Sequence, residues 1–346
     1  MRIMIIIAAV VFQVGVLAYM GGEREYVLRT GKTVYLRTAP VDPQDAFRGD
    51  YVRLDYEISN IPAEYMRDGL KGAAKQGDRI YAVLDVDENQ VGYVRCVTDK
   101  RPDKELFIRG RVDSRWGWTG MAQIRYGIEA YFVEQGKGRQ IEQLRGTRGD
   151  IQVPLEMETA LGSNGTPVLK GYRIGKLGIG LEIKTDPNDG NRRARNSMTM
   201  PAAMRVVGAK IKLKNVSDTS LAIVDLPEGR SFTLEPDLRW AERGSHVWRW
   251  INENAPRKMV ENSNVRILQP GRVYEFAIDF RNPAWFVKKG NESPHTISDP
   301  NMGWSNNFRL VYRPPSKEEC RNLDKAELIW HGYLRSNSFN GGGRID

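Results

Sequence analysis

Apolar residues follow two different patterns along this 346-residue chain. The first is a nearly unbroken apolar run, IMIIIAAVVFQVGVLAYM, at residues 3–20, in which Gln13 is the polar exception. At helical rise this run is about 27 Å long, close to the thickness of a bilayer's hydrocarbon core. It therefore predicts a membrane-spanning helix within residues 1–22.

The charges around this run predict its orientation. Arg2 and the amino terminus are positive, whereas Glu23, Arg24 and Glu25 behind the run are mixed. The positive end is expected in the cytosol, so the body is exported and the chain is a single-pass protein of the bacterial inner membrane. A cleaved signal peptide with Ala18 near the cleavage site is the alternative. The apolar run continues to residue 20 without a small-x-small ending, which favours an uncleaved anchor.

The second pattern is an alternation of apolar and polar residues with period two. Residues 26–184 contain runs such as RIYAVLDV and QVGYVRCV, separated by turn residues about every ten positions. A polar linker at 185–202 is followed by similar runs over 203–340 and a loose tail at 341–346. The sequence thus predicts a mostly β protein: a transmembrane helix followed by two antiparallel β domains, each sandwich or barrel-like.

Composition indicates the kind of secondary structure, and net charge indicates which classes of partner the protein attracts. The 34 glycines and 17 prolines favour strands and turns over helices. The net charge of +9 is spread along the chain, which predicts attraction to anionic lipid or glycan. Nucleic-acid signatures are missing, so we expect no nucleic-acid partner.

Cysteines and histidines are too few to predict a metal site. Cys96 and Cys320 are the two cysteines; they either pair in an oxidising compartment or remain buried thiols. Neither has a ligand partner at metal-binding spacing, and no cofactor is predicted. His331 has no recognisable nucleophile beside it and is interpreted as a hydrogen-bonded histidine.

Two short patterns mimic ligand sites and are interpreted as structural. Asp85-x-Asp87-x-Asn89 resembles the start of a calcium loop, but the glycine and glutamate that such a loop requires are missing, so a hairpin turn is expected. The glycines of IGKLGIGLEI, residues 174–183, resemble part of a phosphate loop, but no lysine followed by serine or threonine completes the pattern. We interpret them as aids to close backbone packing.

The stretch FRGDYVRLDYEIS, residues 47–59, predicts a turn that enters a strand. Strand alternation places Leu54 and Tyr56 on a buried face, together with Val52 and Ile58. The opposite, exposed face then carries Tyr51, Arg53, Asp55 and Glu57.

The pattern Gly49-Asp50-Tyr51-x-x-Leu54-x-Tyr56 resembles the motif that names the GDYXXLXY family of predicted membrane-anchored bacterial proteins. The resemblance covers residues 28–185 and includes a second block, IRYGIEAYFVEQGKGRQIE, at residues 124–142. It implies an anchored extracytoplasmic domain and no established activity.

Two function hypotheses follow. The first is a non-enzymatic, membrane-anchored interaction or assembly protein that binds an envelope or membrane protein, or an anionic glycan. Its candidate binding residues are Tyr51, Arg53, Asp55 and Glu57, with Trp248 and Trp250 of a tryptophan-rich insertion. The alternative is a hydrolase of an envelope polymer that uses two carboxylates, Asp50 with Glu129 or Glu134.

Overall fold

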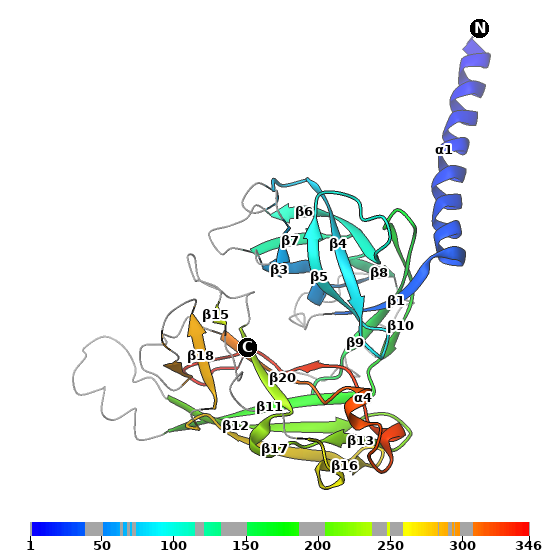
Figure 1. Ribbon diagram of the computed structural model, residues 1–346. Coiled ribbons are helices and arrows are strands. Elements are labelled where there is room, and N and C mark those ends of the chain that lie inside the picture. Colours follow the sequence, from blue (N-terminus) through cyan, green and yellow to red (C-terminus); the bar gives the residue numbers. More distant parts are fainter. Residues whose placement is uncertain are drawn as a thin grey trace. The chain divides into compact units, whose positions relative to one another are not determined.

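Strands dominate the protein, which we describe from a computed structural model (Figure 1). Strands account for 47% of the described residues, in several antiparallel sheets that follow an N-terminal apolar helix, and these residues form no closed barrel. The predicted fold class is confirmed. The structure describes residues 2–38, 51–62, 65–67, 70, 74–114, 121–132, 151–186, 205–236, 248–249, 259–282, 284–289, 293, 295–297 and 307–345.

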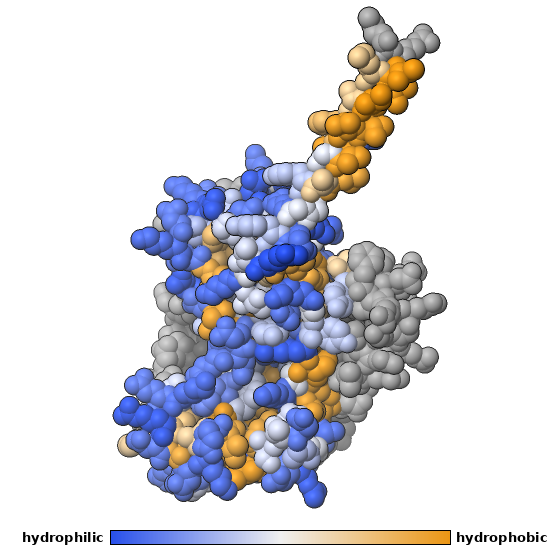
Figure 2. Space-filling model, turned by 90° about the vertical axis from the view of Figure 1, so that its right-hand side faces the viewer, coloured by the Kyte–Doolittle hydropathy of each residue, from blue (hydrophilic) through white to orange (hydrophobic). Residues whose placement is uncertain are grey.

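Helix α1 (Arg2–Thr30) extends beyond the predicted apolar run. It is long and apolar enough to cross a membrane, and its apolar part is not buried against the protein (Figure 2). The extension contains an ion pair between Arg29 and Glu25, 2.6 Å apart and one helical turn from each other. Gly31 ends the helix where an added Cβ would lie 2.5 Å from the Val27 carbonyl oxygen, so only glycine fits this turn without a shift.

The chain divides into two compact units, which we describe separately. Unit 1 contains Met1–Arg115, Ala122–Val133 and Glu156–Arg173, and unit 2 contains Trp116–Met121, Glu134–Leu155 and Ile174–Asp346.

Unit 1 contains a five-stranded antiparallel sheet, a three-stranded sheet and a two-stranded pair. The first has the order β3-β7-β6-β4-β5, the second β1-β9-β10, and the pair is β2-β8. The strands are β1 (Lys32–Arg37), β2 (Tyr51–Arg53), β3 (Asn60–Pro62), β4 (Arg79–Val86), β5 (Gly92–Thr98), β6 (Phe107–Ser114), β7 (Met121–Arg125), β8 (Ala130–Phe132), β9 (Leu155–Leu161) and β10 (Pro167–Ile174).

The motif segment is more broken than the predicted continuous strand. Strand β2 ends at Arg53, and the 3-10 helix η2 (Glu57–Ser59) follows. The predicted burial of Leu54, Tyr56 and Ile58 is nevertheless confirmed, since each is at most 5% exposed. Beyond Arg53 the pairing partner changes: Tyr56 forms an isolated bridge with Thr38, and its hydroxyl donates to the Ile128 carbonyl at 2.8 Å.

Unit 2 is built from four groups of strands. The orders are β11-β12-β17, β13-β16, β14-β20-β21 with β22 also on β20, and β15-β18-β19. The strands are β11 (Leu177–Asp186), β12 (Arg205–Asn215), β13 (Leu221–Val224), β14 (Phe232–Pro236), β15 (Trp248–Arg249), β16 (Val265–Leu268), β17 (Val273–Asp279), β18 (Phe286–Lys289), β19 (His295–Thr296), β20 (Asn307–Tyr312), β21 (Leu334–Arg335) and β22 (Phe339–Asn340). The short helices are η4 (Pro227–Gly229), η6 (Asn262–Asn264), α4 (Lys317–Cys320) and η8 (Ala326–Leu328).

An aromatic core joins the sheets of unit 2. Phe276 of β17 packs edge-on against Phe232 of β14, with ring centroids 4.8 Å apart, and Phe232 also contacts Tyr312 of β20. The Tyr312 hydroxyl accepts the Val224 backbone amide at 2.8 Å, which joins β13 to the same core. Edge-to-face aromatic pairs add to the stabilisation from buried area, so this cluster fixes how the strand groups pack.

Strand β11 ends inside the segment predicted as a linker and pairs with β12 within unit 2. Residues 187–204 lie outside the described ranges, so the proposed domain limits stay predictions. Cys96 in unit 1 and Cys320 in unit 2 are both buried free thiols, which is the second of the two predicted alternatives.

Candidate functional site

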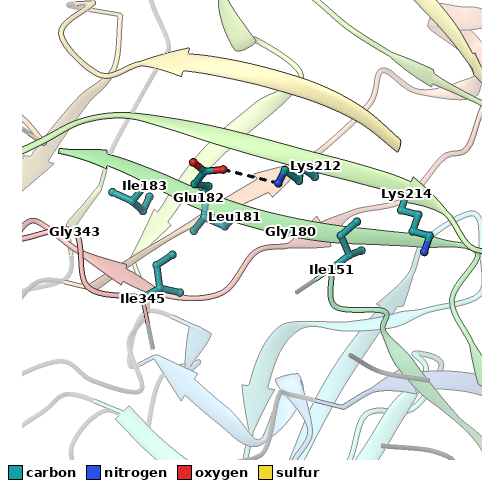
Figure 3. A pocket seen from close by; sticks show the side chains of 9 residues that line it. All are labelled: Ile151, Gly180, Leu181, Glu182, Ile183, Lys212, Lys214, Gly343 and Ile345. Carbon is teal, nitrogen blue, oxygen red and sulfur yellow. Dashed lines mark ion pairs between the residues drawn. The ribbon is translucent and has the colours of Figure 1, made fainter. Parts of the chain in front are cut away.

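An open groove of about 740 Å³ lies along one side of β11 in unit 2 (Figure 3). Four consecutive β11 residues line it, and successive side chains of a strand point to opposite faces. The groove therefore follows the edge of β11 and not one face alone. Its lining residues are Ile151, Gly180, Leu181, Glu182, Ile183, Lys212, Lys214, Gly343 and Ile345.

Two glycines of β11 allow the segment before β9 to pack onto this edge. Gln152 and Ile179 exchange two backbone hydrogen bonds of 2.9 and 2.8 Å. A Cβ on Gly178 would lie 2.7 Å from Ile151 Cγ2, and one on Gly180 would lie 3.2 Å from Ile151 Cγ1. The interpretation of these glycines as aids to close packing is confirmed.

Lysines of β12 supply the positive charge of the groove. Lys212 and Lys214 stand directly opposite Gly180 and Gly178, so their side chains share the outer face of the sheet with the two glycines. Lys212 Nζ lies 3.8 Å from Glu182 Oε2 (Figure 3). Lys214 forms no ion pair or hydrogen bond with any side chain of the described ranges. The groove thus combines an apolar floor with an uncompensated cation.

Sequence reasoning did not select Lys212 and Lys214. The run AKIKLKN lies within the region of predicted strands at 203–340, and the signal for the site is its alternation of lysine with apolar residues. Such alternation is also typical of any solvated strand face. The glycines opposite the lysines distinguish this face, because they let Ile151 pack closely against β11.

Of the predicted catalytic carboxylates, Glu129 is the one within the described residues. Its Oε1 accepts the Tyr126 amide at 2.6 Å and its Oε2 accepts the Gly127 amide at 2.9 Å. Both oxygens therefore hold the turn between β7 and β8, which favours a structural role for this side chain. Asp50 and Glu134 lie outside the described residues.

The predicted binding residues of the motif are only partly described. The backbones of Tyr51 and Arg53 pair with those of Phe132 and Ala130 in the β2-β8 ladder. The structure does not describe the side chains of Tyr51 and Arg53. Asp55 and Glu57, predicted to be exposed, are half-buried because the strand ends before them.

The tryptophan-rich insertion is also described only in part. Trp248 belongs to β15, where its backbone pairs with Lys289 of β18. The Trp248 side chain and all of Trp250 lie outside the described residues. Their assignment as binding residues stays a prediction.

The buried side of the motif forms hydrogen bonds within unit 1. Tyr126 donates its hydroxyl to the Ile58 carbonyl at 2.6 Å, in parallel with the Tyr56 bond to Ile128. Burial, with a smaller contribution from the charge of Glu129, raises the pKa of both tyrosines well above the ordinary value. The two phenols therefore remain neutral donors, which suits a structural role.

A buried ionic cluster in unit 1 joins the β1-β9-β10 sheet. Glu156 receives Arg37 Nη2 at its Oε1 and Arg173 Nε at its Oε2, both at 2.7 Å. Arg173 also stacks on the Tyr35 ring, 3.5 Å from its centroid. No local sequence signal predicts this cluster, because Arg37 and Glu156 are 119 positions apart.

Two predicted structural roles are confirmed. Asp87 Oδ1 accepts the amides of Asn89 and Val91 at 2.8 and 2.9 Å, as a hairpin turn requires. His331 is 6% exposed, and its Nδ1 lies 3.0 Å from the Pro315 carbonyl oxygen. Within the described residues, no group of three or more His, Cys, Asp or Glu side chains is placed to hold a metal ion.

These features define a β-rich protein with an apolar N-terminal helix of membrane-spanning length. Residues 13–171 match the model of the family described as GDYXXLXY protein, so this part of the chain is a GDYXXLXY family domain. The resemblance noted in the sequence is confirmed. The match ends near the end of β10, and all residues that line the groove in unit 2 except Ile151 lie beyond it. Comparisons with curated proteins and with solved structures found no match.

Proposed function

We propose that this chain is a membrane-anchored interaction protein of the cell envelope that binds an envelope protein or an anionic glycan and catalyses no reaction. Helix α1 is the anchor, and the two β units lie on the extracytoplasmic side. The observation that carries the proposal is the groove along β11, where apolar side chains flank the unpaired Lys214. Apolar area provides affinity and an uncompensated lysine provides preference for anionic partners.

The anchor is supported by the junction between α1 and unit 1. Val27, in the last turn of the helix, is 4% exposed, and a Cβ on Gly162 would lie 2.9 Å from its side chain. The Asn164 amide lies 3.4 Å from Glu23 Oε1. These contacts connect the helix end to the β9-β10 hairpin, so the anchor continues into the family domain without a free linker.

The hydrolase alternative has weaker support. It requires two carboxylates that converge on a cleft with oxygens available for substrate. Both oxygens of Glu129 already accept backbone amides. The non-enzymatic interaction function is therefore the one that we favour.

A topology experiment tests the anchoring. An epitope tag after residue 346 is expected to be digested when protease is added to intact spheroplasts, because the positive amino-terminal end stays in the cytosol. A cytosolic protein in the same cells is the protection control. A tag that is digested only after lysis contradicts the proposed orientation.

A crosslinking experiment tests the interaction. The full-length protein is purified from crosslinked membranes as the wild type, as Lys212→Glu/Lys214→Glu, and as Lys100→Glu/Lys104→Glu. The last variant changes net charge equally at exposed positions of unit 1 and serves as the matched control. We expect a partner protein that is crosslinked to the wild type and to the control variant but not to the groove variant Lys212→Glu/Lys214→Glu. The absence of any companion, or equal yield from both variants, refutes the proposal.

A further inference from the structure

We propose that the free edge of β11 binds an extended, acidic segment of an envelope protein, which adds to the sheet as an extra strand. This inference rests on the proposed interaction function and specifies the partner class. Edge strands with unpaired backbone groups are templates for such strand addition.

The backbone geometry identifies the unpaired groups. Ile179 bonds through both its N–H and its C=O to Gln152, so these groups point away from β12. Along a strand, every second residue directs its backbone groups to the same edge. Leu181 and Ile183 therefore present two amides and two carbonyls to the outer edge, within the groove lining. Across the described part of the chain, these groups meet no hydrogen-bonding partner.

The side chains around this edge suit an alternating peptide. Ile183 and Ile345 are partly buried and pack against the core of unit 2, leaving apolar surface beside the edge. The outer face beside Gly180 is already covered by Ile151, so an incoming strand would pair along Leu181 and Ile183, beyond the segment that contains Ile151. A strand added there would place one set of alternate side chains over the apolar surface of Ile183 and Ile345, and the other set on the outer face that carries the lysines.

The charges select the chemistry of the segment. On the outer face, Lys214 is unpaired among the described residues, and Lys212 lies 3.8 Å from Glu182 in a half-exposed pair. Lys210, further along, is occupied by Glu275 at 2.7 Å. Carboxylates on an incoming strand therefore meet their strongest complement at Lys214 and Lys212.

A peptide fits this site better than a glycan. Leu181 and Ile183 repeat their donors and acceptors at the two-residue spacing of a strand, about 6.6 Å. A peptide backbone has this repeat and a polysaccharide does not. An anionic glycan would be held by the lysines alone, leaving the edge amides unpaired.

The experiment uses the full-length protein in detergent micelles and a fluorescein-labelled peptide that alternates Glu and Val. One comparison peptide has every second amide N-methylated, and another carries Lys in place of Glu. N-methylation removes the N–H donors along one edge of the peptide. We therefore expect the peptide to bind at least about fivefold more weakly, which corresponds to the loss of one hydrogen bond. The Lys peptide should bind more weakly still, and bound acidic peptide should slow hydrogen exchange at Leu181 and Ile183.

Ile183→Pro tests the same edge from the protein side. Proline removes an N–H that points outward and breaks no bond to β12, whereas Glu182→Pro removes a ladder bond and serves as the destabilised comparison. We expect Ile183→Pro to lower the affinity for the acidic peptide about fivefold. If circular dichroism shows that this variant is unfolded, the N-methylated peptide on wild-type protein decides the question.

Three results overturn the inference. Equal affinity of the methylated and unmethylated peptides shows that the edge amides are not used. No binding of the acidic peptide excludes this partner class. Binding of polygalacturonate without peptide binding assigns the lysines to a glycan and leaves the interaction function intact. The interaction function itself fails only with the crosslinking experiment, so the two failures are distinguishable.

Discussion

Replacing Glu156 by glutamine tests how the family domain is held together. Glu156 and Arg37 expose only 5% and 4% of their side chains, and both Glu156 oxygens accept arginine nitrogens. The substitution removes the negative charge that the buried Arg37 guanidinium contacts at 2.7 Å. Breaking a buried pair in this way costs about 3–5 kcal/mol. Such a loss is a large fraction of the stability of an ordinary domain.

The matched control lies on the same strand. Glu158→Gln makes the identical change two residues further along β9, where the partner Lys170 is 3.3 Å away and both side chains are about a third exposed. A solvent-screened pair contributes about 0–1 kcal/mol. We therefore expect the two glutamines to differ by at least about 2 kcal/mol.

Hydrogen exchange in the full-length protein measures this difference. The free energy of opening is taken from the slowest amides of β1 and β9, the strands that carry Arg37 and Glu156. A double variant, Arg37→Met/Glu156→Leu, should recover most of the loss, because an apolar pair does not carry the desolvation penalty of ions. Equal effects of Glu156→Gln and Glu158→Gln refute the argument that burial sets the cost.

Two further predictions concern packing and pH. Gly178→Ala would place a Cβ 2.7 Å from Ile151 Cγ2 and should lower the free energy of unfolding by about 1–3 kcal/mol, measured by thermal unfolding. Gly171→Ala is the control, because its Cβ meets one atom at 3.9 Å and should cost much less. Equal losses from the two variants contradict the packing role. Burial raises the pKa of the Asp87 carboxyl, so this group lowers stability as pH rises above the unfolded value of 3.8. Asp87→Asn keeps the turn acceptor, so its free energy of unfolding should rise relative to that of the wild type as the pH of denaturant titrations increases from about 4 to about 7. The gain should stay below about 1.4 kcal/mol per unit of pKa difference, because Asp87 is partly exposed and solvent screens its charge. A difference that does not change with pH rejects this.

Local patterns predicted the features that depend on near neighbours in sequence. The apolar run before residue 20 predicts a helix, because any such helix exposes lipid-compatible side chains all round. Period-two alternation predicted that Leu54 and Tyr56 are buried, and both are. The prediction of a continuous strand over residues 51–58 was wrong, because the pairing partner changes after Arg53: Tyr56 bridges Thr38, and the 3-10 helix η2 begins at Glu57.

Sequence alone therefore determined the class of fold, the apolar helix and the membership of residues 13–171 in the GDYXXLXY family. Tertiary structure decided which charges and edges matter. Arg37 meets Glu156 across 119 positions, and the groove brings Ile151 and Ile345 to the same strand edge. The physical reason is that hydrophobic periodicity depends on neighbours a few residues apart, whereas pairing of buried charges and exposure of an edge depend on which distant segments meet in the folded chain.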